Sequence, residues 1–298
     1  MLPTPPSEEA ILTLIAILNS FAFDYVVRSR LGGTSLIWAV LSETALPKSL
    51  RKAMGTISTR AARLALCSTA FAPFWLSHRA AVDGKPWRAC WEIASVRRAS
   101  AIARFDALVA TSFGLDPADL LHVLAQCDQA GEIPEGALPN GFWRVDRDKE
   151  PELRPTIFAL VASVDLHELI TAAGGDRENG IQAFLNQNDG EGWMLPETLR
   201  LADYGLGHDE RGKHPQPVAS RLGPRFYDWQ LAQTAEESWR ECEIHAKNLR
   251  PAGLLFSEAG GVADTVAVNK GRVPPRGKRR RQDEKGLFAL DGQEDEPA

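Results

Sequence analysis

The sequence predicts a mainly α-helical fold with a small α+β part at its N-terminus and a disordered C-terminal tail. Apolar residues recur at helical spacing from Ile11 to Tyr25, and Ala-rich stretches continue this pattern through the middle of the chain. After Gly260 the apolar density collapses. We therefore expect an N-terminal domain over residues 1–55, a helical module over 56–260 and a disordered tail over 261–298.

Size and composition narrow the class of protein. The 298 residues are 44% hydrophobic and 24% charged, which is enough for a buried core and excludes wholesale disorder, collagen and a coiled-coil rod. The net charge of −5 and the pI of about 5.8 exclude a chain that is basic throughout. Any contact with DNA must therefore come from a local basic patch.

The first helix is expected to begin at Ser7, whose hydroxyl can cap it, while Glu8 and Glu9 complement the free amides of the first turn. Gly32-Gly33 is expected to end this helix. Residues 34–41 fit either a strand or a second helix, and the sequence leaves both open.

Glycine and proline mark the boundaries of the later helices. Further helices are expected, in order, over 57–80 with a break at Pro73, over 88–113 before Gly114, from Asp116-Pro117, over 155–173 before Gly174-Gly175, over 181–188, over 197–202 and over 228–249. Residues 128–140 read as a loop and 143–146 as a short extended piece.

The four cysteines are scattered, without CxxC or short Cys/His spacing, so packed thiols in a reducing cytoplasm are expected. The apolar run over 10–18 is too short to span a bilayer, and Glu8 and Glu9 stand where a signal peptide would carry basic residues. We expect a cytoplasmic protein with no membrane partner.

Recognised catalytic motifs are absent: there is no GxGxxG after a strand, no GxxxxGK[ST], no GxSxG and no HExxH. No catalytic, cofactor-binding or metal-binding residue is therefore predicted. His208 and His214 could ligate a metal, but a solvated loop is favoured because Lys and Arg lie between them. Exposed charge is favoured for the acid pairs, which are Asp146 with Asp148 and Asp209 with Glu210.

The eight tryptophans could stack on bases, but most lie among apolar helical residues. Core packing is therefore expected for all except Trp143 and Trp193, which are in loops.

One motif near the N-terminus is distinctive. The segment Leu18–Arg28 reads LNSFAFDYVVR, and it is followed by Gly32-Gly33-Thr34 and by Leu46-Pro47. This order resembles the stretch that closes the target-recognition region of large adenine-N6 DNA methylases. These are the type IIG restriction-modification methylases and their relatives in BREX and DISARM phage defence.

Later segments resemble the same family in the same order. They are 103–110 with 113–115 and 119–120, which match a helical segment, then 142–150, and then 192–196 with 228–230. The resemblance covers most of residues 8–250. It implies that residues 1–55 are the end of a target-recognition domain and that the helical module follows it.

The chain departs from the family at the catalytic machinery. It has no glycine turn for S-adenosylmethionine, and its Pro5-Pro6 and Pro274-Pro275 pairs lack the aromatic residue that holds a flipped adenine. We expect a non-catalytic DNA-recognition and scaffold portion of an adenine-specific methyltransferase, with no cofactor of its own. The start at Met1 suggests truncation. The alternative is a helical protein–protein interaction module, or a gene remnant, that does not contact DNA.

The implied partners are double-stranded DNA and a catalytic domain or subunit that binds S-adenosylmethionine. Candidate DNA-binding residues are basic residues and a glycine turn that could approach phosphates closely. They are Arg28, Arg30, Gly32, Gly33, Thr34, Lys48, Arg276, Lys278, Arg279, Arg280 and Arg281. Helix termination is the favoured role of the glycines, and a solubilising tail is as plausible as a DNA-binding one. For Arg97, Arg98 and Arg104 a solvated helix face is favoured over DNA contact.

Overall fold

The structure is a computed structural model that describes residues 7–31, 36, 38–47, 54–82, 84–124, 142, 146, 148–207 and 210–249. The chain divides into two units, residues 1–256 and 257–298, and all described residues belong to the first. The predicted disordered tail over 261–298 lies outside the described residues. The boundary at residue 55 stays a prediction.

The described part is mostly helical, as predicted. Its α-helices are α1 (Glu8–Leu18), α2 (Phe21–Arg30), α3 (Trp38–Glu43), α4 (Met54–Ala65), α5 (Ala72–Ser77), α6 (Ser95–Ser112), α7 (Pro117–Leu124), α8 (Pro155–Ala172), α9 (Arg177–Asn186), α10 (Ala219–Leu222), α11 (Asp228–Leu231) and α12 (Ala235–Leu249). Short 3₁₀ turns connect them at η2 (Thr69–Phe71), η3 (Arg79–Val82), η4 (Trp87–Cys90), η5 (Pro151–Leu153), η6 (Leu201–Tyr204) and η7 (Glu210–Lys213).

The described strands are β1 (Thr198–Leu199) and β2 (Gln216–Pro217), which pair antiparallel with Thr198 opposite Pro217. They lie far along the chain from the expected N-terminal α+β part. Where the sequence left strand or helix open over 34–41, the described residues from Trp38 onward form α3.

The first expected helix is two helices. Ser7 caps α1, accepting a hydrogen bond from the Ala10 amide as predicted, but the helix ends at Leu18. Ser20 then caps α2 by accepting from the Phe23 amide, and the two axes differ by 70°. A polar Asn-Ser pair that can cap a new helix therefore outweighs the continuous apolar stripe.

Other boundaries follow the sequence in part. Pro73 lies in the first turn of α5, and α8 ends before Gly174 and Gly175, both at positive φ. Three expectations were wrong in detail. Helix α6 starts at Ser95 rather than residue 88, and the expected helix over 228–249 is split into α11 and α12. The expected helix over 197–202 is instead the strand β1 followed by the 3₁₀ turn η6.

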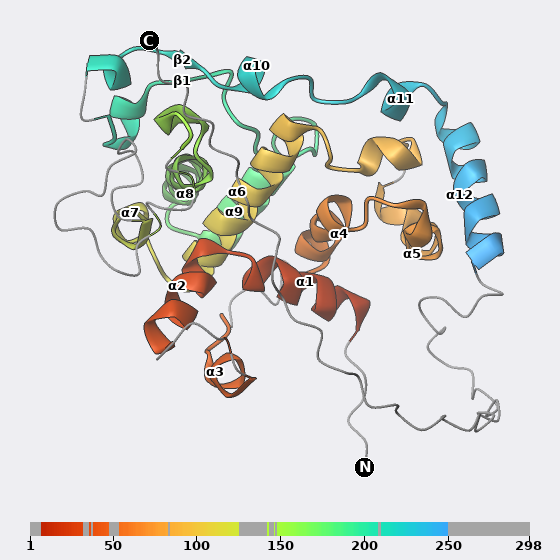
Figure 1. The fold of residues 1–298 in the computed structure, drawn as a ribbon, viewed down its shortest axis with the longest axis horizontal. Helices are drawn as coiled ribbons and strands as arrows, with labels where there is room; N and C mark the ends of the chain where they lie inside the picture. The colour runs from red at the N-terminus through yellow and green to blue at the C-terminus, as the bar shows by residue number, and fades with distance from the viewer. Residues whose placement is uncertain are drawn as a thin grey trace, which may run out of the picture. The chain divides into compact units, whose positions relative to one another are not determined.

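Helix α6 lies at the centre of the described unit, with α8 along one side and α4 and α1 along the other (Figure 1). α9 packs on α8, α1 on α4, and α12 on α5. Ten residues of α8 are buried, which explains its apolar character.

Helix α8 is also the one described helix that is long and apolar enough on its own to cross a bilayer. The pairs α1 with α2 and α6 with α7 are long and apolar enough only if each pair is taken as a single bent segment, with bends of 70° and 114°.

Candidate functional site

The two described candidates for DNA contact lie in the last turn of α2. The Arg28 guanidinium forms an ion pair of 2.7 Å with Asp24 and lies 4.4 Å from the centre of the Phe142 ring. Arg30 is exposed, and its Nη1 donates a 2.8 Å hydrogen bond to the carbonyl of Glu43. Arg30 is therefore the more available of the two for a ligand in solution.

The other candidate DNA-binding residues lie outside the described residues. They are Gly32, Gly33, Thr34, Lys48, Arg276, Lys278, Arg279, Arg280 and Arg281. Whether the glycine turn and the basic run come near Arg28 and Arg30 stays a prediction.

The expected solvated face of α6 was wrong for two of its three arginines. Arg97 and Arg104 expose 1% and 2% of their surface, while Arg98 lies outside the core and donates to the Leu64 carbonyl at 3.3 Å. Burial of a guanidinium requires partners that replace water. Arg97 and Arg104 find these partners in a charged cluster between α4, α6 and the loop after α9.

Glu92 is one acidic centre of this cluster, and it exposes 1% of its surface. Nε and Nη2 of Arg97 bind its two carboxylate oxygens at 3.0 and 3.1 Å, a bidentate fork that fixes both groups. Arg63 and Arg104 each place a nitrogen 3.5 Å from the same carboxylate. The Glu92 amide also donates to the Arg63 carbonyl at 2.7 Å, which holds the segment before α6 against α4.

Glu191 is the second acidic centre, in the loop over residues 187–192. Its carboxylate lies 2.9 Å from Arg63 and 2.8 Å from Arg97, and it also pairs with Lys85. Burial alone would raise its pKa, but the charges of Arg63 and Arg97 hold the pKa of Glu191 well below its usual range.

Backbone carbonyls of the same loop bind the remaining arginines. Arg60 donates to the carbonyls of Leu185, Gly190 and Glu191, the last two at 3.0 and 2.8 Å, and Arg104 also donates to Glu191. The loop passes so close to Arg104 that a Cβ on residue 192 would lie 2.5 Å from Nη1 of this arginine. Gly192 also has a positive φ of 83°. Only glycine fits this position.

Among the described residues, the cluster carries more positive than negative charge. Four arginines and Lys85 face the two carboxylates Glu92 and Glu191 and, at the edge, Asp189. This excess of positive charge and the burial affect the pKa values of two arginines. Burial and the neighbouring Arg63 lower the pKa of Arg60 to about 10, and burial lowers that of Arg104 to about 9. All the same, these guanidinium groups stay charged at neutral pH.

A pocket of about 400 Å³ opens beside the cluster. Arg60, Arg63 and Lys85 supply its positive charge, and the side chain of Lys85 is 36% exposed. Its other lining residues come from α4, η3 and the loop after α9, namely Gly55, Thr56, Thr59, Ala81, Val82, Asp189 and Gly190.

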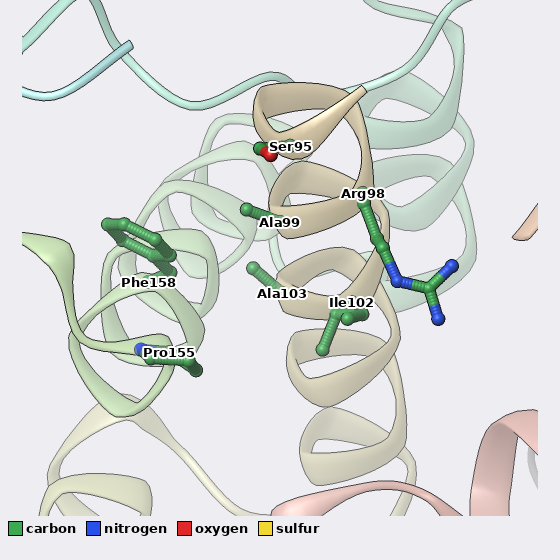
Figure 2. Close-up of a pocket in the computed structure, with 7 residues that line it drawn as sticks. All are labelled: Ser95, Arg98, Ala99, Ile102, Ala103, Pro155 and Phe158. Atoms are coloured by element: carbon green, nitrogen blue, oxygen red, sulfur yellow. The ribbon is translucent and has the colours of Figure 1, made fainter. Parts of the chain in front are cut away.

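Two smaller pockets on α6 are apolar. One, of about 210 Å³, lies between α6 and α8, with Ala99 and Ala103 on one wall and Phe158 and Pro155 on the other (Figure 2). The second, of about 280 Å³, lies between α6, α1 and α4 and shares Arg98 and Ile102 with the first. Because they share lining residues, the pockets adjoin along α6.

Which tryptophans are buried and which are exposed differs from the expectation. Trp193 is 3% exposed, stacks on Phe184 and donates to Asp165, so its predicted loop exposure was wrong. Trp229 is 42% exposed and stacks on Tyr227 at 6.3 Å between ring centroids, and Trp38 is 78% exposed, so the expectation of core packing was wrong for both. Trp143 lies outside the described residues.

The acid pairs also differ from the expectation. Asp146 is buried and accepts hydrogen bonds from the amide and hydroxyl of Thr156 at 3.2 and 3.3 Å, so it anchors the start of α8. Asp148 and Glu210 are exposed as predicted, whereas Asp209 lies outside the described residues.

No activated nucleophile stands out in the described part of the chain. Cys67, Cys90 and Cys242 are free thiols, and burial raises the pKa of the first two to about 11 and that of Cys242 to about 12. No three His, Cys, Asp or Glu side chains of the residues placed by the structure form a metal-binding group. His208, one of the two candidate ligands, lies outside these residues. What the charged cluster can do chemically is hold an anion.

The spacing of the arginines in the sequence indicates the charged cluster, although none of the predictions from the sequence used it. Arg97 and Arg104 are separated by seven positions in a helix that is otherwise Ala-rich, and Arg60 and Arg63 by three positions in another. Such spacing repeats one helix face, and in each case that face also carries the apolar residues.

Comparison with known proteins adds no relative. No protein family, no curated protein and no solved structure matches this chain.

Proposed function

We propose that this chain is the non-catalytic DNA-recognition and scaffold portion of an adenine-specific (N6) DNA methyltransferase in a restriction-modification or phage-defence system. It acts in the cytoplasm with a separate catalytic part that binds S-adenosylmethionine, and residues 1–55 are the end of its target-recognition domain. The observation that supports this most is the packing of the two resembling segments. The amide of Phe21 donates to Asp106 at 2.8 Å, joining the LNSFAFDYVVR segment to the segment over 103–110.

The contact with DNA is assigned to the C-terminal end of α2 and the residues after it. Arg30 is exposed there, and its one hydrogen bond to a carbonyl leaves its positive charge without a neutralising partner among the described residues. Phosphate contacts of this kind give affinity without reading sequence, and they weaken as salt increases.

A variant pair tests this assignment. Arg30→Gln removes the proposed phosphate contact, and Arg200→Gln removes another exposed arginine, which pairs with Asp203 elsewhere. Fluorescence anisotropy with a labelled duplex measures both affinities. We expect Arg30→Gln to weaken binding and to reduce the salt slope by about 1, while Arg200→Gln stays near the wild type. Equal effects of the two variants would remove α2 from the DNA contact.

Calorimetry separates the proposal from a complete methyltransferase. S-adenosylmethionine titrated into the isolated chain is expected to give no binding heat, and to give heat once the catalytic part is added. A saturable heat from this chain alone would make it an enzyme in its own right.

An interaction module that never contacts DNA is the second candidate, favoured by an exposed apolar face. Ile11, Leu14 and Ile15 of α1 are 38–42% exposed, Trp38 of α3 is 78% exposed, and Ile15 also lines the pocket shared with α4 and α6. Ile11, Leu14 and Ile15 are three and four positions apart and so share one face of α1, and exposed apolar surface of this kind is typical of a protein interface.

Substitution within α1 distinguishes the two candidates. Ile11→Gln with Ile15→Gln is expected to weaken binding to the catalytic part and to leave duplex affinity unchanged. If the wild-type chain binds a protein partner through this face and never binds duplex, with or without that partner, the interaction module is correct and the DNA proposal is wrong.

A further inference from the structure

The pocket beside the charged cluster has the chemistry of an anion site. We propose that it binds a phosphate group, held by the ammonium of Lys85 and the guanidinium groups of Arg60 and Arg63. This site is separate from the DNA contact assigned to Arg30 in α2. The phosphate can belong to a small phosphorylated ligand, where it carries close to two charges, or to a nucleic-acid backbone, where it carries one, and the test below distinguishes these sources.

The charge balance of the cluster is the first argument. Among the described residues, five cationic side chains face three carboxylates, an excess of two positive charges in a region where Arg60 and Arg63 expose only 8% and 5% of their surface. Uncompensated buried charge is costly, and a bound dianion would offset it. The depressed pKa of Arg60 agrees with this excess, because neighbouring like charge contributes to it.

The position of the charge is the second argument. The excess is not sealed within the core but lines a pocket of about 400 Å³, within the usual size range of about 300–1,000 Å³ for small-ligand sites. Nε of Arg60 is buried and has no hydrogen-bond partner among the described residues. Thr56 adds a hydroxyl group to the lining, whereas the hydroxyl of Thr59 donates to the Gly55 carbonyl at 3.0 Å.

The cations of the pocket favour a doubly charged ligand, because the attraction grows with the charge of the ligand. Asp189 lines the pocket, and Glu191 already pairs with Arg63 and Lys85, so both would repel or compete with a weak anion. A terminal phosphate carries close to two charges at neutral pH. It also reaches deeper than a diester in a duplex, because only one of its oxygens is substituted.

Isothermal titration calorimetry of the full chain with inorganic pyrophosphate tests the proposal. Lys85→Gln removes the most exposed cation of the pocket, and Lys213→Gln is the matched control at a lysine that is 59% exposed and outside the pocket. We expect saturable binding to the wild type, a loss of about tenfold or more in Lys85→Gln, and little change in Lys213→Gln. Circular dichroism and thermal unfolding confirm that each variant is folded.

Two results would overturn the proposal: no saturable heat with phosphate or pyrophosphate, or equal affinity in wild type and Lys85→Gln. Where binding is found, competition identifies the source of the phosphate. Displacement of pyrophosphate by duplex DNA supports a backbone phosphate, and binding that duplex leaves unchanged supports a small phosphorylated ligand. Because duplex affinity that depends on Arg30 is measured separately, failure of this site and failure of the proposed function remain distinguishable.

Discussion

The backbone amide of Phe21 donates a 2.8 Å hydrogen bond to Oδ1 of Asp106, 85 positions further along the chain. Phe21 is the first residue of α2, so the carboxyl group satisfies one of the amides that a helix N-terminus leaves free. Asp106 is buried on α6, and this burial raises its pKa to about 7. One carboxyl group thus joins the N-terminal helices to the central helix.

Stability should depend on pH through Asp106. Its folded pKa is raised above the ordinary 3.8, so the folded state holds the proton more tightly, and this contribution to stability is lost as pH rises from about 4 through 7. Asp106→Asn keeps an oxygen for the Phe21 amide but cannot ionise.

Urea unfolding between pH 4 and 8 measures the difference between wild type and Asp106→Asn. We expect the variant to gain up to about 4 kcal/mol relative to wild type across this range. Buried Asp146 and Asp165, whose pKa values burial also raises, are present in both proteins and cancel. A difference that does not change with pH would contradict the account.

Glu92 should be essential to the core. It is buried among Arg63, Arg97 and Arg104, so Glu92→Gln removes the carboxylate that faces Arg104 and one of the two that pair with Arg63 and Arg97. We expect a loss of about 3–5 kcal/mol in the free energy of unfolding. Asp203→Asn, which removes the acid of an exposed ion pair with Arg200, should cost less than about 1 kcal/mol. Similar losses in the two variants would show that the buried cluster is not held by charge.

Glu191 should have the opposite pH signature to Asp106. Its pKa is depressed, so its ion pairs contribute stability above the ordinary 4.5, and that contribution is lost as pH falls below this value. The destabilisation caused by Glu191→Gln is therefore expected to be largest near neutral pH and to shrink below pH 4.5. A destabilisation that stays constant down to acid pH, followed by chemical denaturation, would be inconsistent with these ion pairs.

Two helical glycines should respond differently to alanine. A Cβ on Gly180 of α9 would lie 2.5–2.9 Å from side-chain and backbone atoms of Ile170, whereas one on Gly55 of α4 would meet, among the described residues, the flexible carboxylate of Glu9 at 3.1 Å. Alanine gains about 0.5–1 kcal/mol over glycine from helix propensity alone. Thermal unfolding is expected to show Gly55→Ala near or above wild type and Gly180→Ala lower by about 1–3 kcal/mol. Stabilisation by Gly180→Ala would mean that α8 and α9 are not in close contact.

Much of the fold was predictable, because local signals agree with the packing. Ser7 and Pro117 lie where a helix begins and Gly174 where one ends, and the local conformational preferences of these residue types predict those boundaries. The apolar sequence of α8 likewise predicts its burial. The break between α1 and α2 was missed, since a capping serine competes with an unbroken apolar stripe and only tertiary contact decides. Phe21 finds that contact in Asp106.

The charged cluster was the harder part to predict. Arg97 and Arg104 are identical in type to arginines on a solvated helix face, and their burial depends on Glu92 and on Glu191, which is far along the chain. A single sequence shows the periodicity of each helix, but it does not show which loop will cover a given helix face. The pairing of α6 with the loop over 187–192 therefore emerges only in three dimensions.

The central claim, that this chain contacts DNA as part of a methyltransferase, is tested most directly by the salt dependence of its affinity for duplex DNA. Anisotropy of a labelled duplex, measured from 50 to 300 mM salt with and without the catalytic part, should show log affinity falling linearly with log salt concentration, by about 0.9 for each phosphate contacted. Binding that salt does not change, or no binding even in the presence of the catalytic part, would contradict the claim.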